Sequence, residues 1–456
     1  MKRIIALCSV ATILLAGCGI YRPYSRPEVE VEGLYGESTG RNDTTSIADL
    51  SWDELFTDPL LQKLIRQGLD NNADLGIARL RIKEAEAALL SSRLAYLPSI
   101  SLSSQGEVSR FNGERIFKTY SLATPAEWEI DIFGRLTNSK RRAKVALEQS
   151  HAYKQAVQTN LIATIANSYY HLLMLDGQLE ISRRTADTWT ETSRTLQLQK
   201  NVGETNEAAV AQAKANKLAV DASILTLQKH VRSLENSLSA LLGMTPQRIE
   251  RSTLQEQVFP DQLTVGIPLL LLNRRPDIRQ AEFMLMQAFY TTNVARSAFY
   301  PRITLSGTLG WTNQSGAGII NPGNWLLNAI GSLTQPLFNR GANVANLRIA
   351  KAQQEEAVLA FRQSLLNAGN EVSDALAQWQ TADSRLAIDR EQIVLLQTTV
   401  NSSRQLMEYS SSVTYLEVLT AQQSLLEAEL TEMDDCFEKI QGVVNLYHAL
   451  GGGRYD

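Results

Sequence analysis

The chain has 456 residues, of which 44% are hydrophobic and 20% are charged, and its formal net charge at pH 7 is -4. This composition is typical of a folded protein, and the length allows two or three domains. There is no basic excess, which argues against a nucleic-acid partner.

The first residues predict an export signal. "MKRIIALCSVATILLAGCG" has a basic start, an apolar stretch from Ile4 to Ala16 that is too short to span a membrane, and then Leu15-Ala16-Gly17-Cys18. The ending "LAGC" resembles a bacterial lipobox, which implies that residues 1–17 are removed and that Cys18 carries lipid. Gly19, in place of aspartate, implies the outer membrane. The alternative is an ordinary signal with a chance cysteine.

Cysteine use agrees with this interpretation. Cys8 would leave with the signal and Cys18 would be modified, so Cys436 would remain alone and no intrachain disulfide is expected. Cys436 reads as a small buried helix residue rather than a reactive thiol.

Two long windows without proline, 126–245 and 337–456, predict long helices. A helix from Thr137 to about Lys200 would be roughly 95 Å long. Apolar side chains with 3-4 spacing predict coiled-coil packing in both windows. The first seam is Val210, Ala213, Lys217, Val220, Ile224, Leu227, Val231, Leu234, Leu238 and Leu241, and the second is Leu416, Leu419, Gln423, Leu426, Leu430, Met433, Phe437, Ile440, Val444 and Tyr447.

Clusters of Gly, Ser and Thr at 201–210 and 409–418 predict a chain reversal in each window, so that each forms two antiparallel helices joined at a tip. A continuous helix is the alternative, and the pair Gly203 and Asn206 makes it weaker for the first window.

Four segments predict β-strands, at about 98–111, 119–133, 301–313 and 325–338. Apolar and polar residues alternate along them, as in Ile303, Leu305, Gly307, Leu309 and Trp311. Trp128, Ile130 and Ile132 likewise oppose Glu127, Glu129 and Asp131. This pattern is typical of a transmembrane β-barrel, with a half-buried soluble sheet as the alternative.

Four strands cannot close a barrel, and an open edge in lipid leaves backbone groups unsatisfied. A membrane location therefore requires an oligomer. Two copies would supply eight strands around a plugged interior, whereas three would supply twelve and leave a lumen.

The chain is internally duplicated. Residues 74–243 and 273–451 both run helix, strand, strand, helix, tip and helix, and "LAYLP", "FGR" and "LLG" in the first repeat are echoed by "SAFYP", "FNR" and "ALG" in the second. The remaining parts are an N-terminal segment (18–73), a linker (244–272) and a C-terminal tail (452–456). Each repeat would cross from helices into strands and return.

Several motifs in this order resemble the TolC-like outer-membrane factors, and among them the lipoprotein branch of resistance-nodulation-division (RND) efflux systems, the NodT/OprM-like proteins. The motifs are "LLLLNRRPDIRQAE" (269–282), "WEIDIFGR" (128–135), "WDELFTDPLLQKLI" (52–65) and "YLEVLTAQQSLLEAE" (415–429). The likeness covers nearly the whole mature chain.

The resemblance implies a mainly α fold with membrane β-strands. Three copies would form a twelve-stranded outer-membrane β-barrel and a long coiled-coil α-helical tunnel in the periplasm, with segments 18–73 and 244–272 at its equator. The homotrimer would be the passive exit duct of a tripartite efflux pump, working with a periplasmic adaptor and an inner-membrane RND pump. Its cargo would be drugs, toxic small molecules or metal ions. A duct for type I protein secretion and a periplasmic spacer without a pore are the alternatives.

The resemblance also assigns site residues. Cys18 would carry the lipid, the only attached group expected. The adaptor would contact the tips at Gly203, Glu204, Thr205, Asn206, Ser411, Ser412, Val413 and Thr414. Leu416, Glu417 and Thr420 would form the periplasmic gate, where three copies of Glu417 would make an acidic ring. The alternative for Glu417 is a solvated or helix-paired residue.

The gate departs from the family pattern. Relatives often have aspartate where this chain has Ala209 and Thr420, and arginine where it has Gln423, so the sequence does not predict the charge-paired gate usual in the family. An apolar or hydroxyl-lined closure is the alternative.

No catalytic or metal-binding constellation is present in the sequence, because the four histidines are scattered on helices, and we expect a protein that is not an enzyme. Arg274, Arg275 and Asp277 are predicted to be structural, with Pro276 and Asp277 in the first turn of a helix.

Overall fold

The computed structural model describes residues 21–28, 34, 47–110, 112–113, 116–259, 275–313, 324–409 and 415–452. The chain divides into two compact units. The sheet unit comprises Met1–Val29, Leu80–Ala152 and Arg279–Gln363, and the helical unit comprises Glu30–Arg79, Tyr153–Ile278 and Ser364–Asp456.

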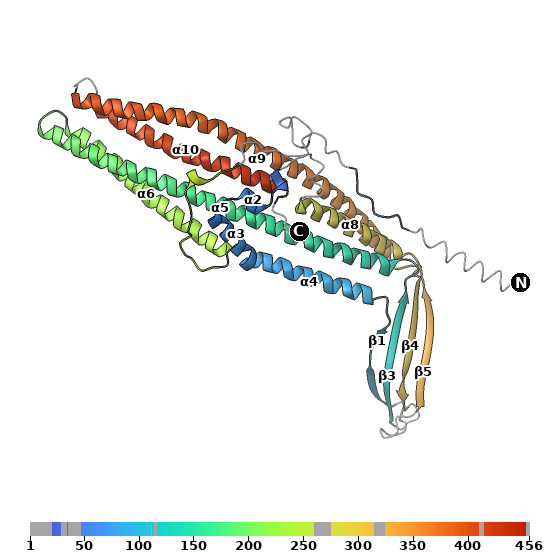
Figure 1. The fold of residues 1–456 in the computed structure, drawn as a ribbon. Helices are drawn as coiled ribbons and strands as arrows, with labels where there is room; N and C mark the ends of the chain where they lie inside the picture. The colour runs from blue at the N-terminus through green and yellow to red at the C-terminus, as the bar shows by residue number, and fades with distance from the viewer. Residues whose placement is uncertain are drawn as a thin grey trace. The chain divides into compact units, whose positions relative to one another are not determined.

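The sheet unit contains one antiparallel sheet (Figure 1). Its strands are β1 (Ser99–Ile100), β2 (Ser103–Ser109), β3 (Phe117–Ile130), β4 (Arg302–Thr312) and β5 (Asn324–Thr334). β3 pairs with β1 and β2 on one side and with β4 on the other, and β4 pairs with β5. The sheet therefore has β1 and β2 at one edge and β5 at the other.

Two strands end earlier than expected, for local reasons. β3 ends at Ile130 because Asp131 accepts hydrogen bonds from the backbone N–H groups of Leu136 and Thr137 (2.9 and 2.7 Å), which starts the next helix. β5 ends at Thr334, close to Pro336, which has no N–H to donate to a ladder. The expected strand at 98–111 is split between β1 and β2.

The helices dominate the rest of the described chain, so the expected mainly α fold with strands is confirmed. The helical unit holds η2 (Ile47–Asp49), α2 (Trp52–Leu55), α3 (Pro59–Asn71), α6 (Glu207–Leu241), η3 (Leu254–Glu256) and α10 (Tyr415–Ala449). Four helices have residues in both units: α4 (Ala73–Leu94), α5 (Arg135–Asn201), α8 (Pro276–Ser297) and α9 (Ala342–Tyr409). Among the described helices, none has a stretch long and apolar enough to cross a membrane.

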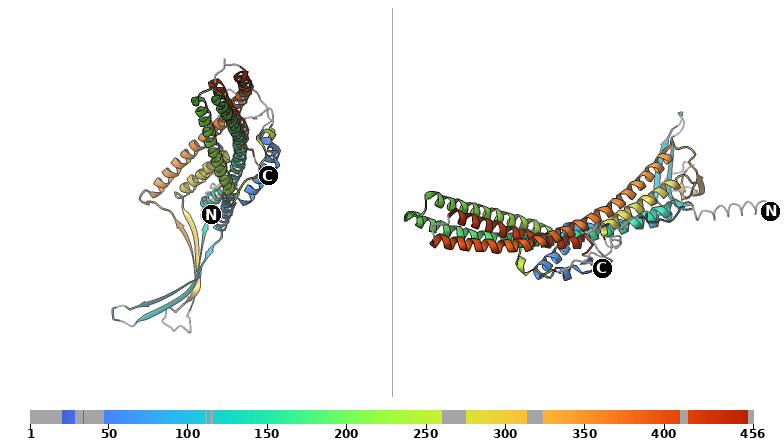
Figure 2. Two further views of the ribbon diagram at one scale, coloured as in Figure 1. Left: turned by 90° about the vertical axis from the view of Figure 1, so that its left-hand side faces the viewer. Right: turned by 90° about the horizontal axis from the view of Figure 1, so that it is seen from above.

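Within the helical unit, α5 and α6 form one antiparallel pair, α9 and α10 form another, and the two pairs run side by side (Figure 2). The expected seams largely face inward, since Val210, Ala213 and Val220 of α6 and Leu419 of α10 belong to one buried cluster. Two seam positions are wrong. Leu416 is 58% exposed and Gln423 is exposed, because α10 turns Val418, Leu419, Ala421 and Gln422 inward.

The motif at 52–65 belongs to the core of the helical unit. Trp52 and Phe56 are buried at 1% and 0% exposure, and the Phe56 ring lies 6.4 Å from that of Tyr170 and 6.0 Å from that of Tyr447. Burying aromatic groups of this size is a large stabilising contribution, so this motif is structural.

Candidate functional site

One face of the sheet is apolar across strands, and the register shows it directly. Ile130, Ile303 and Leu333 lie opposite one another on β3, β4 and β5, as do Leu122, Trp311 and Trp325. The Trp311 and Trp325 rings are 4.7 Å apart. Successive residues point to opposite faces, so apolar rows in register give one continuous apolar face.

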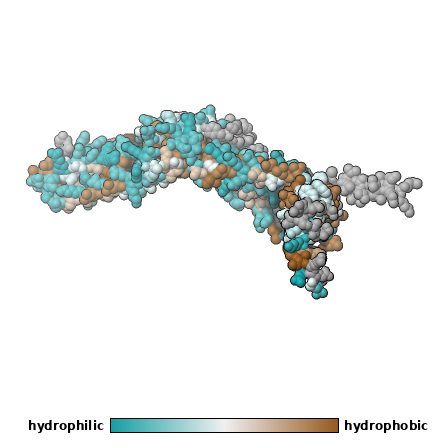
Figure 3. Space-filling model, turned by 90° about the horizontal axis from the view of Figure 1, so that it is seen from below, coloured by the Kyte–Doolittle hydropathy of each residue, from teal (hydrophilic) through white to brown (hydrophobic). Residues whose placement is uncertain are grey.

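The apolar face is uncovered. Trp325, Leu327 and Leu333 are 68%, 80% and 69% exposed, and Figure 3 shows apolar side chains gathered over the strands. An exposed apolar surface of this kind marks a site of contact with a partner or with lipid.

The opposite face of the sheet is polar. Glu129, Thr304 and Ser332 form one cross-strand row, and Pro125, Thr308 and Asn328 form another. Ile330 and Leu326 interrupt this pattern on β5. A sheet with one apolar and one polar face can separate lipid from water.

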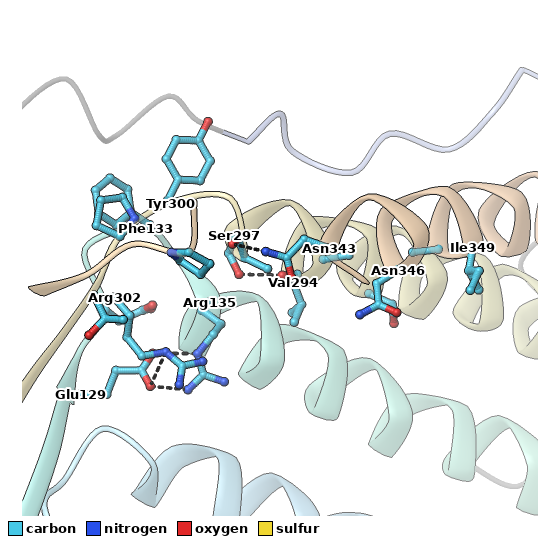
Figure 4. Close-up of a pocket in the computed structure, with 18 of the residues that line it drawn as sticks. Glu129, Phe133, Arg135, Val294, Ser297, Tyr300, Arg302, Asn343, Asn346 and Ile349 are labelled. Atoms are coloured by element: carbon cyan, nitrogen blue, oxygen red, sulfur yellow. Dashed lines mark hydrogen bonds and ion pairs between the residues drawn. The ribbon is translucent and has the colours of Figure 1, made fainter. Parts of the chain in front are cut away.

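A cavity of about 610 Å³ lies in the sheet unit where strands meet helices (Figure 4). In it, Arg135 Nε and Nη2 donate to Glu129 Oε1 and Oε2 (2.7 and 2.6 Å), and Arg302 Nε lies 3.7 Å from Glu129 Oε2. The hydrogen bonds to Glu129 raise the pKa of the Arg135 guanidinium. The rings of Phe133 and Tyr300 stack at 5.2 Å.

The charges of this cavity balance, because Arg135 and Arg302 are matched by Glu129 and Asp131, which also line it. The motif "WEIDIFGR" therefore fixes the point where β3 passes into α5. Tyr300 and Arg302 were not predicted as part of this cluster, because nothing in their spacing points to residues 129–135.

Residues 21–28, here the N-terminal strap, lie against the sheet unit. The Tyr21 hydroxyl donates to the Phe133 carbonyl (2.9 Å), the Tyr24 ring packs edge-on at 5.7 Å from Phe289, and Arg26 donates twice to Glu282 (2.7 and 2.6 Å). Cys18 lies outside the described residues.

The first tip is built by two capping devices. Gly203 has a φ of +84°, Gly203 N–H donates to the Lys200 carbonyl and Glu204 N–H donates to that of Gln199 (3.1 and 2.9 Å), a Schellman motif that ends α5. Asn206 then accepts from Ala209 N–H (3.0 Å) and starts α6. Lys200 and Glu207 form an ion pair across the turn.

The predicted tip residues Gly203, Glu204, Thr205 and Asn206 therefore occupy one tight turn. Thr205 is half-buried and the other three are exposed. Ser411, Ser412, Val413 and Thr414, predicted for the second tip, lie outside the described residues.

The predicted gate residues share the exposed face of α10. Leu416, Glu417 and Thr420 are exposed, and Gln423 continues this face with a hydrogen bond to Glu427 (Nε2 to Oε1, 3.1 Å). These side chains face away from the core of their own chain, so they are available to a lumen or to another copy.

Ala209 has a different place. It is fully buried beside Trp189 and Leu419, so a charged group there would have no water. On the buried side of α10, opposite the predicted gate residues, the Gln422 amide donates to Thr192 Oγ1 of α5 (3.1 Å). Gln422 and Thr192 were not predicted from the sequence as interacting residues. A single polar residue on a long amphipathic helix is usually expected to face solvent.

Arg275 occupies a structural position. It is 4% exposed, and its guanidinium contacts the Ala449 carbonyl (2.9 Å), Asp277 (2.6 Å) and Glu371 (2.7 Å), which joins the start of α8 to α9 and to the end of α10. Arg274 lies outside the described residues. Within the described part of the chain, no group of three or more His, Cys, Asp or Glu side chains is placed to hold a metal ion.

Comparisons with known proteins agree on one family. The family model described as "Outer membrane efflux protein" matches residues 64–244 and 267–452. The cation efflux system protein CusC of Escherichia coli O6:H1 is 30% identical over 451 residues, which are 97% of each chain. The probable outer membrane lipoprotein SilC of Salmonella typhimurium is 30% identical over 460 residues, 98% of each chain.

Among solved structures, the open state of the Neisseria gonorrhoeae MtrE outer membrane channel superposes with a TM-score of 0.85 at 26% identity. The match covers 96% of this chain and 98% of the MtrE chain.

Proposed function

Because the chain belongs to the outer membrane efflux protein family and is an outer-membrane efflux channel, we propose that three copies of it form the passive exit duct of a tripartite pump. A periplasmic adaptor and an inner-membrane RND pump are the other two parts of this assembly. In this role the protein conducts its cargo and catalyses no reaction.

The observation that carries the proposal is the uncovered apolar face of the sheet, in register over β3, β4 and β5. This face suits lipid, and the polar face suits a water-filled lumen. The sheet has four strand rows, counting β1 and β2 as one, and neither edge pairs with another segment among the described residues. Three copies joined edge to edge supply twelve rows, enough to enclose a lumen.

The helices offer matching surfaces for the same assembly. Leu218 and Leu225 of α6 are 64% and 67% exposed, and Ile388 and Leu395 of α9 are 65% and 62% exposed. Each pair is one heptad apart, so each helix carries a second apolar stripe beside the one it buries in its own chain. Neighbouring copies would bury these stripes against each other.

A lipid on Cys18 would fit this arrangement. Acyl chains on Cys18 would enter the membrane close to the end of β3, since the N-terminal strap is fixed at Tyr21 and Arg26. Barrel and anchor would then meet the same leaflet.

At the periplasmic end, the tip residues around Gly203 and their counterparts 411–414, which lie outside the described residues, would receive the adaptor. Leu416, Glu417 and Thr420 of three copies would form the aperture. Because Thr420 and Gln423 are uncharged and Ala209 is buried, closure would rest on Leu416 and on hydroxyl groups, with Glu417 favouring cations.

The lipid-facing assignment is tested with two neighbouring residues of β5. We expect Leu327→Arg to lower the amount of assembled oligomer in the outer-membrane fraction severely, because an arginine in the middle of the apolar band costs about 2–4 kcal/mol. Asn328→Arg, one residue away on the polar face, is the matched control and should assemble nearly normally. Equal behaviour of the two variants would contradict a membrane barrel.

The partner is tested by cross-linking in native cells from a photoreactive residue at Glu204, with Ser237 on the same helix pair as the control position. Capture of an RND adaptor from position 204 only would support the proposal and lead, through its pump, to the cargo. Capture of the adaptor of an ATP-driven exporter would move the function to type I protein secretion. A correctly assembled oligomer without conductance in planar bilayers would favour a spacer.

A further inference from the structure

Two buried carboxyl groups face each other between α9 and α10, in the helical unit. Asp435 is fully buried and Asp389 is 8% exposed. In the described part of the chain, no donor is aligned for a hydrogen bond with either oxygen of Asp435 or with Asp389 Oδ2, although Arg385 forms an ion pair with Asp435. The two side chains are within hydrogen-bond reach of each other, and a hydrogen bond between two carboxyl groups needs a proton on one of them.

The charged groups around Asp435 do not neutralise this pair. Arg385 of α9 lies 2.7 Å from Asp435 Oδ1, but it is about half exposed and also contacts Glu438 (3.5 Å). Glu438, on the same helix as Asp435, adds a negative charge. On the α5 side, Gln178 and His171 face the adjacent Asp434. One half-exposed guanidinium is thus shared between Asp435 and Glu438.

The first repeat has no such pair. α6 and α10 both contain 35 residues, so matching their ends pairs Asp435 with Leu227. Matching "DGQLEIS" of α5 to "DSRLAID" of α9 pairs Asp389 with Ser182. Ser182 is buried and Leu227 is half-buried. The same fold position is therefore served without any carboxyl group, so packing alone does not require the two aspartates.

Two carboxylates in contact cannot both be ionised without a large cost. Burial, followed by the hydrogen bond with Asp389, raises the pKa of Asp435 from 3.8 to about 6. Asp435 therefore takes up and releases one proton in this pH range, and when protonated it can donate a hydrogen bond to Asp389.

We propose that Asp389 and Asp435 form a proton-binding site that holds α9 against α10 when it is protonated and weakens their contact when the proton leaves. The proton comes from and returns to the surrounding water, and no other group is consumed. Since α10 also carries Leu416, Glu417 and Thr420, external acidity would strengthen the helix pair that bears the predicted gate.

The sign follows from linkage. An acid whose folded pKa lies above its unfolded pKa binds more protons in the folded state, so stability is full below the unfolded value near 4 and falls as pH rises through about 6. With these two pKa values, the local opening equilibrium of α9 and α10 should increase about tenfold between pH 5 and pH 7. His171, whose pKa is lowered by burial, has the opposite sign and therefore cannot imitate this response.

The test is hydrogen–deuterium exchange of the full-length oligomer at pH 5 and pH 7, corrected for the chemical exchange rate. Peptides covering 380–395 and 428–440 should lose protection about tenfold at pH 7, whereas the matching peptides 173–188 and 220–232 of the first repeat should not. Asp435→Asn should keep the protection of pH 5 at pH 7, because an amide can donate to Asp389. Asp383→Asn, a half-exposed acid paired with Lys439 (2.6 Å), is the matched control and should respond like the natural chain.

An equal pH response in both repeats, or a response that persists in Asp435→Asn, would overturn the proposal. If Asp435→Asn fails to assemble, infrared spectra of the natural protein decide, because a protonated carboxyl band that disappears between pH 5 and pH 7 is required. The effect on the gate rests on the proposed function, but the exchange experiment does not. A chain without conductance at any pH contradicts the duct and leaves the proton site standing.

Discussion

The two repeats have matching helix lengths and helix ends, and they differ in the side chains that hold their helices together. α4 and α8 contain 22 residues each, and α6 and α10 contain 35 each. Both repeats end in the same Schellman motif, at Gly243 and at Gly451, each with a positive φ.

In each repeat, the residue just before or at the start of the first helix donates a side-chain hydrogen bond to a carbonyl at the end of the last helix, but the donor differs. The Asn72 amide donates to the Leu241 carbonyl (3.0 Å) in the first repeat, and the Arg275 guanidinium donates to the Ala449 carbonyl (2.9 Å) in the second. The second repeat surrounds this bond with Asp277 and Glu371, and it alone has the carboxyl pair of Asp389 and Asp435. The same arrangement of helices is therefore held by a neutral clamp (Asn72 to Leu241) in the first repeat and by an ionised clamp (Arg275 to Ala449) in the second. Since the neutral clamp suffices for the fold, the charged groups of the second repeat can have a further role.

The largest difference between the repeats is expected near the tip. Trp189 of α5 is 1% exposed and packs in a cluster with Ala209, Val210 and Leu419. We expect Trp189→Ala to cost about 3–5 kcal/mol of local stability, because the cavity it leaves cannot be filled by alanines.

The matched position in the second repeat is Leu396, which is half-buried. Leu396→Ala should cost no more than about 2 kcal/mol. Exchange protection of α5 and α6, measured beside that of α9 and α10, checks both values. Equal losses would mean that the two tips are held together in the same way.

The ionised clamp should matter more than the neutral one. We expect Arg275→Ala to destabilise the helices by about 3 kcal/mol, because it removes hydrogen bonds to two carboxylates and one carbonyl. Asn72→Ala should cost about 1–2 kcal/mol, which includes its cap on Leu75 N–H (3.0 Å).

Urea unfolding followed by circular dichroism measures both clamp variants. Asn72→Asp is the control for Asn72→Ala, because aspartate keeps the cap on Leu75 N–H and loses only the hydrogen bond to the Leu241 carbonyl. A smaller loss for Arg275→Ala than for Asn72→Ala would show that the buried charge brings no net gain.

The glycine turns differ in what surrounds them. A Cβ at Gly243, whose φ is +67°, would lie 2.9 Å from the Asn71 carbonyl oxygen, whereas none of the described atoms comes within 4 Å of one at Gly203. We expect Gly203→Ala to cost about 1 kcal/mol from backbone strain alone, and Gly243→Ala to cost about 2 kcal/mol because a close contact is added. Unfolding midpoints of the two variants give the comparison, and equal midpoints would remove the contact from the explanation.

Periodicity allowed most of the fold to be predicted. Two-residue alternation in 301–313 and heptad spacing in 210–241 depend only on residues close together in the sequence. They can therefore be recognised without knowing which strand or helix packs against them. Gln423 and Leu416 were misplaced because a 3-4 pattern drifts around a long helix, and only contact with Thr192 and Trp189 shows which side is inward.

The candidate sites were predictable where a turn makes them and not where helices meet. Gly203 and Asn206 predict a turn, because glycine and asparagine favour the backbone conformations and side-chain hydrogen bonds found in turns. Asp389 and Asp435 are 46 positions apart on different helices, and each looks like an ordinary surface acid in a charged segment. Their meeting depends on the register of α9 against α10, which no local pattern fixes.

The smallest expected effect is at the Lys200–Glu207 ion pair of the first tip, whose response to pH should be opposite to that of the Asp389–Asp435 pair. The hydrogen bond and charge of Lys200 lower the pKa of Glu207 below 4.5, so this ion pair stabilises the first tip above that pH and loses its effect as pH falls through the folded value. The carboxyl pair of the second repeat has the opposite sign, since it weakens as pH rises toward 6. We expect Lys200→Met to remove the acid sensitivity of exchange in peptides around 195–210 and to leave peptides 380–395 unchanged.

Salt distinguishes the Lys200–Glu207 ion pair from the Asp389–Asp435 pair further, because an exposed ion pair is screened at high ionic strength and a buried carboxyl pair is not. If salt abolished both responses, the Asp389–Asp435 site would have to be open to solvent, and its role as a buried proton site would fail.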